Sequence, residues 1–141
     1  MEGRARAELA LPLYVDQRAL PLLQLRYVGD YSDDELQQFL QQMDAVLKLP
    51  GKKAGIVDLS DAVPGTAKQR RVHAEWIADR KPLLQRDFVA AAIVTDSAII
   101  RGTVTAIFWI APLPLPTHVT ASMEQAEGWL EPYLAGLTTA R

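Results

Sequence analysis

Two carboxylates and a hydroxyl follow an apolar segment near the middle of the chain. Asp58 lies near the end of the run Ala54-Gly55-Ile56-Val57-Asp58-Leu59, and Ser60 and Asp61 follow directly after it. A continuous apolar run of this kind is typical of a strand covered on both faces in a parallel or mixed sheet. Open α/β sheets bind their ligands outside the carboxyl ends of such strands. The sequence therefore predicts a partner-contact site here, although all three residues also occur in ordinary turns and caps.

The same residues permit one catalytic interpretation. Ser60 or Asp58 combined with His73 would supply a nucleophile and a general base, which is the arrangement of a hydrolase. Nothing in the sequence positions these groups, because no serine lies in a Gly-x-Ser-x-Gly elbow and there is no glycine-rich phosphate loop. We therefore predict that the protein is not an enzyme and assign no catalytic residue. A hydrolase is the lesser alternative.

Metal and cofactor sites find no support in the composition. The chain has no cysteine, which excludes thiolate nucleophiles, iron–sulfur clusters and cysteine-based zinc sites. Its two histidines, His73 and His118, show neither His-x-x-x-His nor Glu-x-x-His spacing. We predict no metal and no cofactor.

Charge is distributed unevenly along the chain. Residues 30–44 carry acidic side chains and no base, whereas residues 66–86 carry Lys68, Arg70, Arg71, Arg80, Lys81 and Arg86 against two acids. A basic helix can dock on an acidic partner, and Arg70 and Arg71 are its predicted contact residues. The formal net charge is −2 and no base-reading motif is present, so nucleic-acid binding is not predicted.

A single charge interrupts the apolar residues 98–115. Arg101 lies there beside Gly102, with Trp109 farther along. An arginine can hold an anionic group with bidentate geometry, or it can reach solvent while its stem covers the core. We predict Arg101 and Trp109 as anchors for an apolar or amphipathic acidic, lipid-like molecule. If this helix is exposed instead, a homodimer is expected.

Length and composition indicate one globular domain. The chain has 141 residues, of which 49% are hydrophobic and 23% charged. We expect a lead-in over residues 1–12, one domain over 13–137 and a tail over 138–141. Residues 98–115 are too short and too interrupted to span a membrane, and no secretory signal is recognised. The expected location is cytoplasmic.

Capping patterns and periodicity predict the elements. Strands are expected at residues 14–18, 20–28, 54–59, 88–94 and 118–121. Helices should follow Ser32, Thr66 and Ser122, where Glu35, Gln69 and Gln125 complete capping boxes, and a further helix should follow Thr95, Asp96 and Ser97, which supply its possible caps. In the second helix Val72, Trp76, Leu83 and Leu84 mark the apolar side and Pro82 bends or ends it, while Gly136 should cap the last helix. This alternation predicts an α/β fold, a mixed sheet of about five strands flanked by about four helices.

The run Gly55-Ile56-Val57-Asp58-Leu59-Ser60 followed by a helix resembles STAS/SpoIIAA-like domains. A closer resemblance, to small uncharacterised SpoIIAA-like bacterial proteins, covers roughly residues 14–135. Its matching positions are Pro21-Leu22-Leu23, Gln69-Arg70-Arg71 with Trp76, Arg101-Gly102 with Thr105-Ala106, and Ala126 with Trp129.

This resemblance implies a regulatory protein-interaction module of bacterial signalling that docks on a protein partner. In STAS proteins a phosphorylatable hydroxyl lies just after the Asp-Leu-Ser strand. Here the expected Asp-Ser-x-Gly is replaced by Ala62-Val63-Pro64-Gly65-Thr66, which makes Thr66 the nearest phosphosite candidate and Ser60 the second. We expect partner contacts at Asp58, Ser60, Asp61, Thr66, Arg70 and Arg71.

Overall fold

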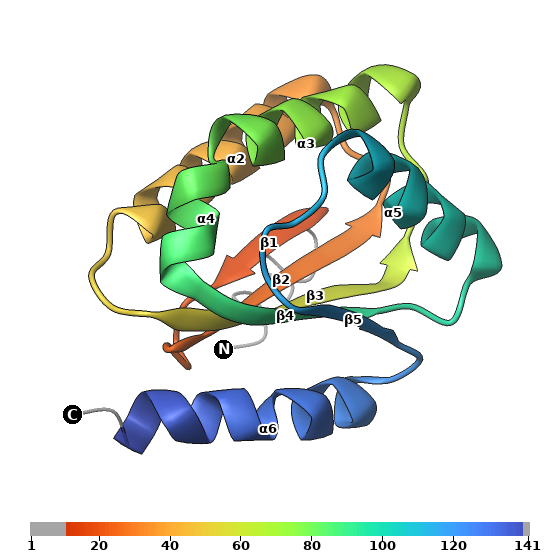
Figure 1. Ribbon diagram of the computed structural model, residues 1–141. Coiled ribbons are helices and arrows are strands. Elements are labelled where there is room, and N and C mark those ends of the chain that lie inside the picture. The colour runs from red at the N-terminus through yellow and green to blue at the C-terminus, as the bar shows by residue number, and fades with distance from the viewer. Residues whose placement is uncertain (1–10, 140–141) are drawn as a thin grey trace, which may run out of the picture.

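A five-stranded mixed sheet organises residues 11–139, the part of the chain that this computed structural model describes (Figure 1). The strands are β1 (Leu13–Asp16), β2 (Leu22–Gly29), β3 (Lys53–Ala62), β4 (Phe88–Val94) and β5 (Thr117–Thr120), and they lie in the sheet in that order. β1 pairs antiparallel with β2, and the other neighbours are parallel. The predicted mixed sheet is confirmed.

Helices cover the two faces of the sheet unequally. Figure 1 shows α2 (Asp33–Leu47), α3 (Ala67–Asp79), α4 (Lys81–Asp87) and α5 (Ala98–Ile110) on one face, and α6 (Met123–Thr139) alone on the other. The predicted α/β class with helices on both sides of the sheet is therefore confirmed. We call the first face the helix-rich face and the second the α6 face.

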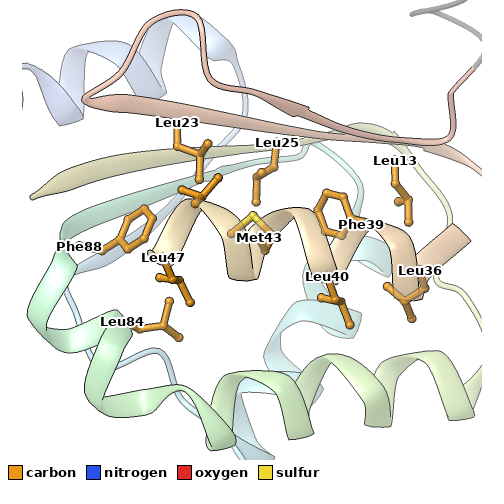
Figure 2. Close-up of a cluster of buried hydrophobic side chains, with 11 residues drawn as sticks. Leu13, Leu23, Leu25, Leu36, Phe39, Leu40, Met43, Leu47, Leu84 and Phe88 are labelled. Carbon is orange, nitrogen blue, oxygen red and sulfur yellow. The ribbon is translucent and has the colours of Figure 1, made fainter. Parts of the chain in front are cut away.

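The main core lies between the sheet and α2. Ser32 Oγ accepts a hydrogen bond from the Glu35 amide at 3.0 Å, and the Glu35 carboxylate accepts one from the Ser32 amide at 2.8 Å, so the predicted capping box starts this helix. The helix then buries the predicted stripe of Leu36, Phe39, Leu40, Met43, Val46 and Leu47. Figure 2 shows five of these side chains beneath Leu23 and Leu25 of β2, namely Leu36, Phe39, Leu40, Met43 and Leu47. Each fully buried leucine contributes about 1.5–3 kcal/mol.

A second core joins the sheet to α6. Ala54 and Ile56 of β3 and Ala90 and Ala92 of β4 pack against Ala126 and Leu130 of this helix. Because side chains alternate along a strand, the intervening residues of β3 and β4 point to the helix-rich face. This alternation fixes which residues can meet α3 and α5.

Two expected boundaries lie elsewhere. β3 continues to Ala62, because Asp61 and Ala62 pair with Val28 and Gly29 of β2, so Ser60 and Asp61 lie in the strand and not in the loop after it. The predicted second helix is divided at Arg80 into α3 and α4, and Pro82 stands in the first turn of α4, where a proline is tolerated. The helices in the described chain therefore number five.

Two smaller expectations were wrong. Leu83 does not join the apolar side of its helix, because 37% of it is exposed. Gly136 does not end the last helix, which continues to Thr139, because this glycine lacks the positive φ that a C-terminal glycine cap needs. Of the predicted lead-in and tail, residues 1–10 and 140–141 lie outside the described residues.

Candidate functional site

The predicted polar cluster at the end of β3 forms on the α6 face. Asp58 Oδ1 accepts hydrogen bonds from the Ser60 amide at 3.0 Å and from the Ser60 hydroxyl at 2.6 Å. Arg26 of β2, which the sequence interpretation overlooked, donates to Asp61 at 3.0 Å and lies 3.9 Å from Asp58. Arg26 and Asp58 line a groove of about 260 Å³ that Met123 of α6 also lines. Most of the charge in the cluster is thus paired internally.

His73 lies on the opposite side of the sheet from this cluster. It lines a cavity with Val57 and Leu59, whose side chains alternate with that of Asp58. Since the sheet stands between His73 and Ser60, the arrangement required for the hydrolase alternative does not form. Among residues 11–139 there is also no group of three His, Cys, Asp or Glu side chains that would hold a metal ion.

Thr66 caps α3, as its pattern predicts. Its Oγ1 accepts a hydrogen bond from the Gln69 amide at 3.0 Å, and the Gln69 side-chain oxygen accepts one from the Thr66 amide at 3.0 Å. The Gln69 side-chain nitrogen also donates to the Tyr31 carbonyl at 2.9 Å. Gln69 is buried, so it fixes both the start of α3 and the rotation of the helix about its axis. The partner role of Thr66 stays a prediction.

The basic residues of α3 and α4 are partly neutralised by α2. Lys68 pairs with Asp33 at 3.1 Å, and Arg80 forms a two-contact ion pair with Asp44. The hydrogen bonds from Arg80 lower the pKa of the Asp44 carboxyl below its ordinary value. Arg71 remains exposed and forms no ion pair with another described residue.

An apolar cavity of about 190 Å³ lies on the helix-rich face of the sheet, under the helices. Its walls include Met43 of α2, Trp76 and Ile77 of α3, Leu84 of α4, and Ile100, Val104, Ile107 and Phe108 of α5. The segment between α5 and β5, which Figure 1 shows crossing this face, contributes Leu113 and Leu115. Sequence analysis did not identify this cavity.

Two small residues side by side leave the floor of the cavity open. Gly55 of β3 is paired with Ala91 of β4, and both line the cavity. The next inward pair along the same strands, Val57 and Ile93, is large and branched. The space therefore follows from the small volume of one register pair.

Polar groups of the cavity gather near the start of α3. The His73 ring nitrogen Nδ1 lies 2.8 Å from the Gln69 carbonyl oxygen, and Nε2 lies 2.9 Å from the Tyr27 hydroxyl. A carbonyl can only accept, so Nδ1 carries the proton and Tyr27 donates to Nε2. Burial lowers the pKa of His73 and raises the pKa of Tyr27 above its ordinary value. Both groups are therefore neutral at pH 7, and each satisfies the other.

Arg70 is the one formally charged residue among the described residues that line the cavity. Its Nη1 donates to the Gly65 carbonyl at 2.8 Å and more weakly to the Pro64 carbonyl at 3.5 Å. It forms no ion pair with a carboxylate of residues 11–139. Arg70 thus combines half burial with an unbalanced positive charge.

The two predicted ligand anchors lie away from the cavity. Arg101 is exposed, and Trp109 is 85% exposed on the outer surface of α5. Neither lines the cavity, whose contacts with α5 come from the opposite side of this helix. Ile99 and Ile110 are also exposed, at 70% and 73%.

Comparison with known proteins assigns the family. A model of the family described as SpoIIAA-like matches residues 22–131, a span that includes every residue of the cavity. The chain belongs to the SpoIIAA-like family. The resemblance inferred from the sequence is thereby confirmed, and the family supports a regulatory or interaction module in general terms.

A solved structure shares the fold of this SpoIIAA-like chain. It is the crystal structure of an uncharacterized protein of the DUF3478 family, with a SpoIIAA-like fold, from Shewanella loihica. The TM-score is 0.62 at 12% identity, and the match covers 84% of this chain and 91% of the other. No curated protein matches the chain. Within residues 11–139, no helix is both long enough and apolar enough to cross a membrane.

Proposed function

We propose that this SpoIIAA-like protein binds a small apolar or amphipathic molecule in the cavity beneath α3 and α5. The observation that carries the proposal is the cavity of about 190 Å³ with an almost wholly apolar lining. An engineered apolar cavity of about 150 Å³ binds benzene, so the apolar part of the ligand would be roughly of that size or slightly larger. Pockets that bind small molecules have this apolar character with a few polar groups.

The packing around Gly55 supports a retained space. A Cβ added at this glycine would lie 3.7 Å from the Phe88 ring and 3.9 Å from the Leu23 carbonyl oxygen, which are ordinary contact distances. The fold therefore has room for a larger residue at this floor position. An empty apolar cavity costs stability, since its lining atoms lack contact partners. Ligand binding accounts for a space that packing alone does not require.

Filling the cavity tests the proposal. Ala91→Leu places a larger apolar side chain in the floor, so it should abolish uptake of an apolar probe such as phenethyl alcohol. Ala106→Leu is the matched control, because Ala106 is exposed on α5 and does not line the cavity. Native mass spectrometry and thermal shift would measure binding. A wild-type protein that shows neither a retained ligand nor probe binding would contradict the proposal.

A second candidate function is docking on an acidic protein partner. The family assignment supports it, and Ser60, Asp61, Thr66 and Arg71 are exposed around the end of β3 and the start of α3. Asp58 holds Ser60 in place. Cross-linking in cells would measure how much partner protein is captured. Arg71→Glu should reduce this amount, whereas the control Lys81→Glu on α4 should leave it unchanged. Equal partner recovery with both variants would count against docking at this surface.

Phosphorylation would act at Thr66 in preference to Ser60. A phosphate on Ser60 would stand beside Asp58 and Asp61, so like charges would repel. A phosphate on Thr66 would stand at the N-terminus of α3, where the helix dipole stabilises negative charge. Mass mapping of the protein from its native cells should find phosphate on Thr66, and modification of Ser60 alone would contradict this order.

The outer surface of α5 supports a homodimer. Ile99, Trp109 and Ile110 are mostly exposed on it, and soluble monomers seldom leave such apolar patches uncovered. Sedimentation equilibrium should show a dimer that Trp109→Ser shifts toward monomer. A wild-type protein that sediments as a monomer at high concentration would exclude this interface.

A further inference from the structure

The charge on Arg70 has no counterpart in the cavity. No aspartate or glutamate is among the described residues that line it, and the partners of the Arg70 side chain there are backbone carbonyls. Both of those hydrogen bonds come from Nη1. A half-buried cation is ordinarily paired with an anion, because removal from water favours compensation by an opposite charge.

The Tyr31 hydroxyl lies at the same end of the cavity. It is 3.2 Å from the position that a Cβ on Gly65 would occupy, while Arg70 Nη1 is 2.8 Å from the Gly65 carbonyl oxygen. Both groups therefore meet at Gly65. Among the described residues, no hydrogen bond is formed by this hydroxyl. The neighbouring Tyr27 and His73 pair offers no free donor, because each already binds the other or the Gln69 carbonyl.

We propose that the ligand is a small apolar carboxylic acid, whose carboxylate binds Arg70 and the Tyr31 hydroxyl while its apolar part extends toward Gly55 and Ala91. The planar guanidinium matches a carboxylate with two parallel hydrogen bonds, and the tyrosine adds a third donor. This inference rests on the proposed ligand-binding function. It places the acidic group at Arg70 and not at Arg101, which is exposed on α5.

A matched pair of probes tests the inference. Phenylacetate and phenethyl alcohol share a ring and differ in charge, and isothermal titration at pH 7.5 gives the affinity of the wild-type protein for each. A charge-assisted contact should favour phenylacetate by about tenfold or more. If neither probe binds, the ligand-binding function itself is overturned. If both bind equally, the cavity stands and the acidic head group is wrong.

Variants locate the anion contact. Arg70→Met should remove the preference for phenylacetate over phenethyl alcohol, and Arg71→Met is the matched control on the exposed neighbour, which should keep that preference. Tyr31→Phe should reduce affinity for phenylacetate severalfold. Arg70→Lys keeps the positive charge but lacks the bidentate geometry, so it should retain part of the preference for phenylacetate. This variant provides the test if Arg70→Met fails to fold. Equal losses at Arg70 and Arg71 would overturn the inference, since they would indicate general electrostatic attraction.

Discussion

Replacing Gly55 with alanine should stabilise the protein and reduce the space for a ligand. Gly55 lies in β3 and is not among the described glycines with positive φ, so an alanine fits the backbone. The nearest atoms to the added Cβ would be the Phe88 ring at 3.7 Å and the Leu23 carbonyl oxygen at 3.9 Å. The methyl group therefore occupies the cavity floor without displacing a neighbour.

Two terms give the magnitude. Burying one methyl group contributes about 0.8 kcal/mol. Replacing glycine where alanine fits adds about 0.4–1 kcal/mol, because the unfolded chain loses conformational freedom. The free energy of unfolding of Gly55→Ala should therefore rise by about 1–2 kcal/mol, and the Tm by about 3–8 °C for a chain of 141 residues.

Gly102→Ala on α5 is the matched control. A Cβ there meets nothing within 4 Å, so the variant gains about 1 kcal/mol of helix propensity without touching the cavity. Urea unfolding followed by circular dichroism measures both variants, and titration with phenethyl alcohol measures binding. Affinity should fall only for Gly55→Ala. A Gly55→Ala protein that is destabilised, or that binds as well as the control, would refute the reasoning about the floor.

Three further predictions concern buried and paired groups. Burial lowers the pKa of His73, so the unfolded chain binds a proton more readily than the folded protein does. The free energy of unfolding should therefore fall as the pH drops through about 6.5. Urea unfolding at pH 8, 6.5 and 5 measures this pH dependence, which His73→Phe should weaken. Tyr27→Phe leaves His73 Nε2 without its hydrogen-bond donor and should lower the free energy of unfolding by about 1–2 kcal/mol. The control Tyr14→Phe should lower it by less than about 0.5 kcal/mol. The pKa of Asp44 is lowered chiefly by Arg80, so the stability from this pair is present above about pH 4 and is lost as the pH falls through the lowered value. Because the two side chains are 34% and 27% exposed, Asp44→Asn should cost only about 0.5–1 kcal/mol at pH 7, and an unchanged acid-unfolding profile would contradict this role.

The elements that sequence predicted well are those whose signals are local. The capping box at Ser32 and the apolar stripe of α2 are complete within one helix, and both are present in the structure. Thr66 and Gln69 start α3 in the same way. The end of β3 was misplaced because Ser60 and Asp61 favour turns, whereas pairing with β2 continues the strand through Asp61. Propensity gave way there to a tertiary contact.

The cavity depends on registers that no single segment contains. Gly55 and Ala91 are far apart in the sequence, and only the β3–β4 pairing places them together. The β2–β3 register likewise pairs Arg26 with Asp58. Such coincidences need the strand alignment, which periodicity does not supply. A glycine in an apolar strand was nevertheless a visible sign that the strand offers no side chain for packing at that position.

Arg70 and Arg71 show why the site could not be predicted residue by residue. The two are adjacent and chemically identical, yet Arg70 lines the cavity and Arg71 is exposed. The difference comes from the rotation of α3, which buried Gln69 fixes through its hydrogen bond to the Tyr31 carbonyl. From sequence, both were assigned to one partner-binding surface.

The segment between β3 and α3 belongs to both candidate functions, and this decides how they can be separated. Val63 and Pro64 line the cavity, and Arg70 holds the Gly65 carbonyl, whereas Arg71 does not contact the cavity. A substitution at Arg70 therefore changes the cavity and the segment together, so a loss of partner capture from it would not distinguish docking from ligand binding. Arg71→Glu does distinguish them. If it weakens partner capture and leaves phenylacetate affinity unchanged, docking and ligand binding use separate surfaces. If it weakens both, the segment couples them.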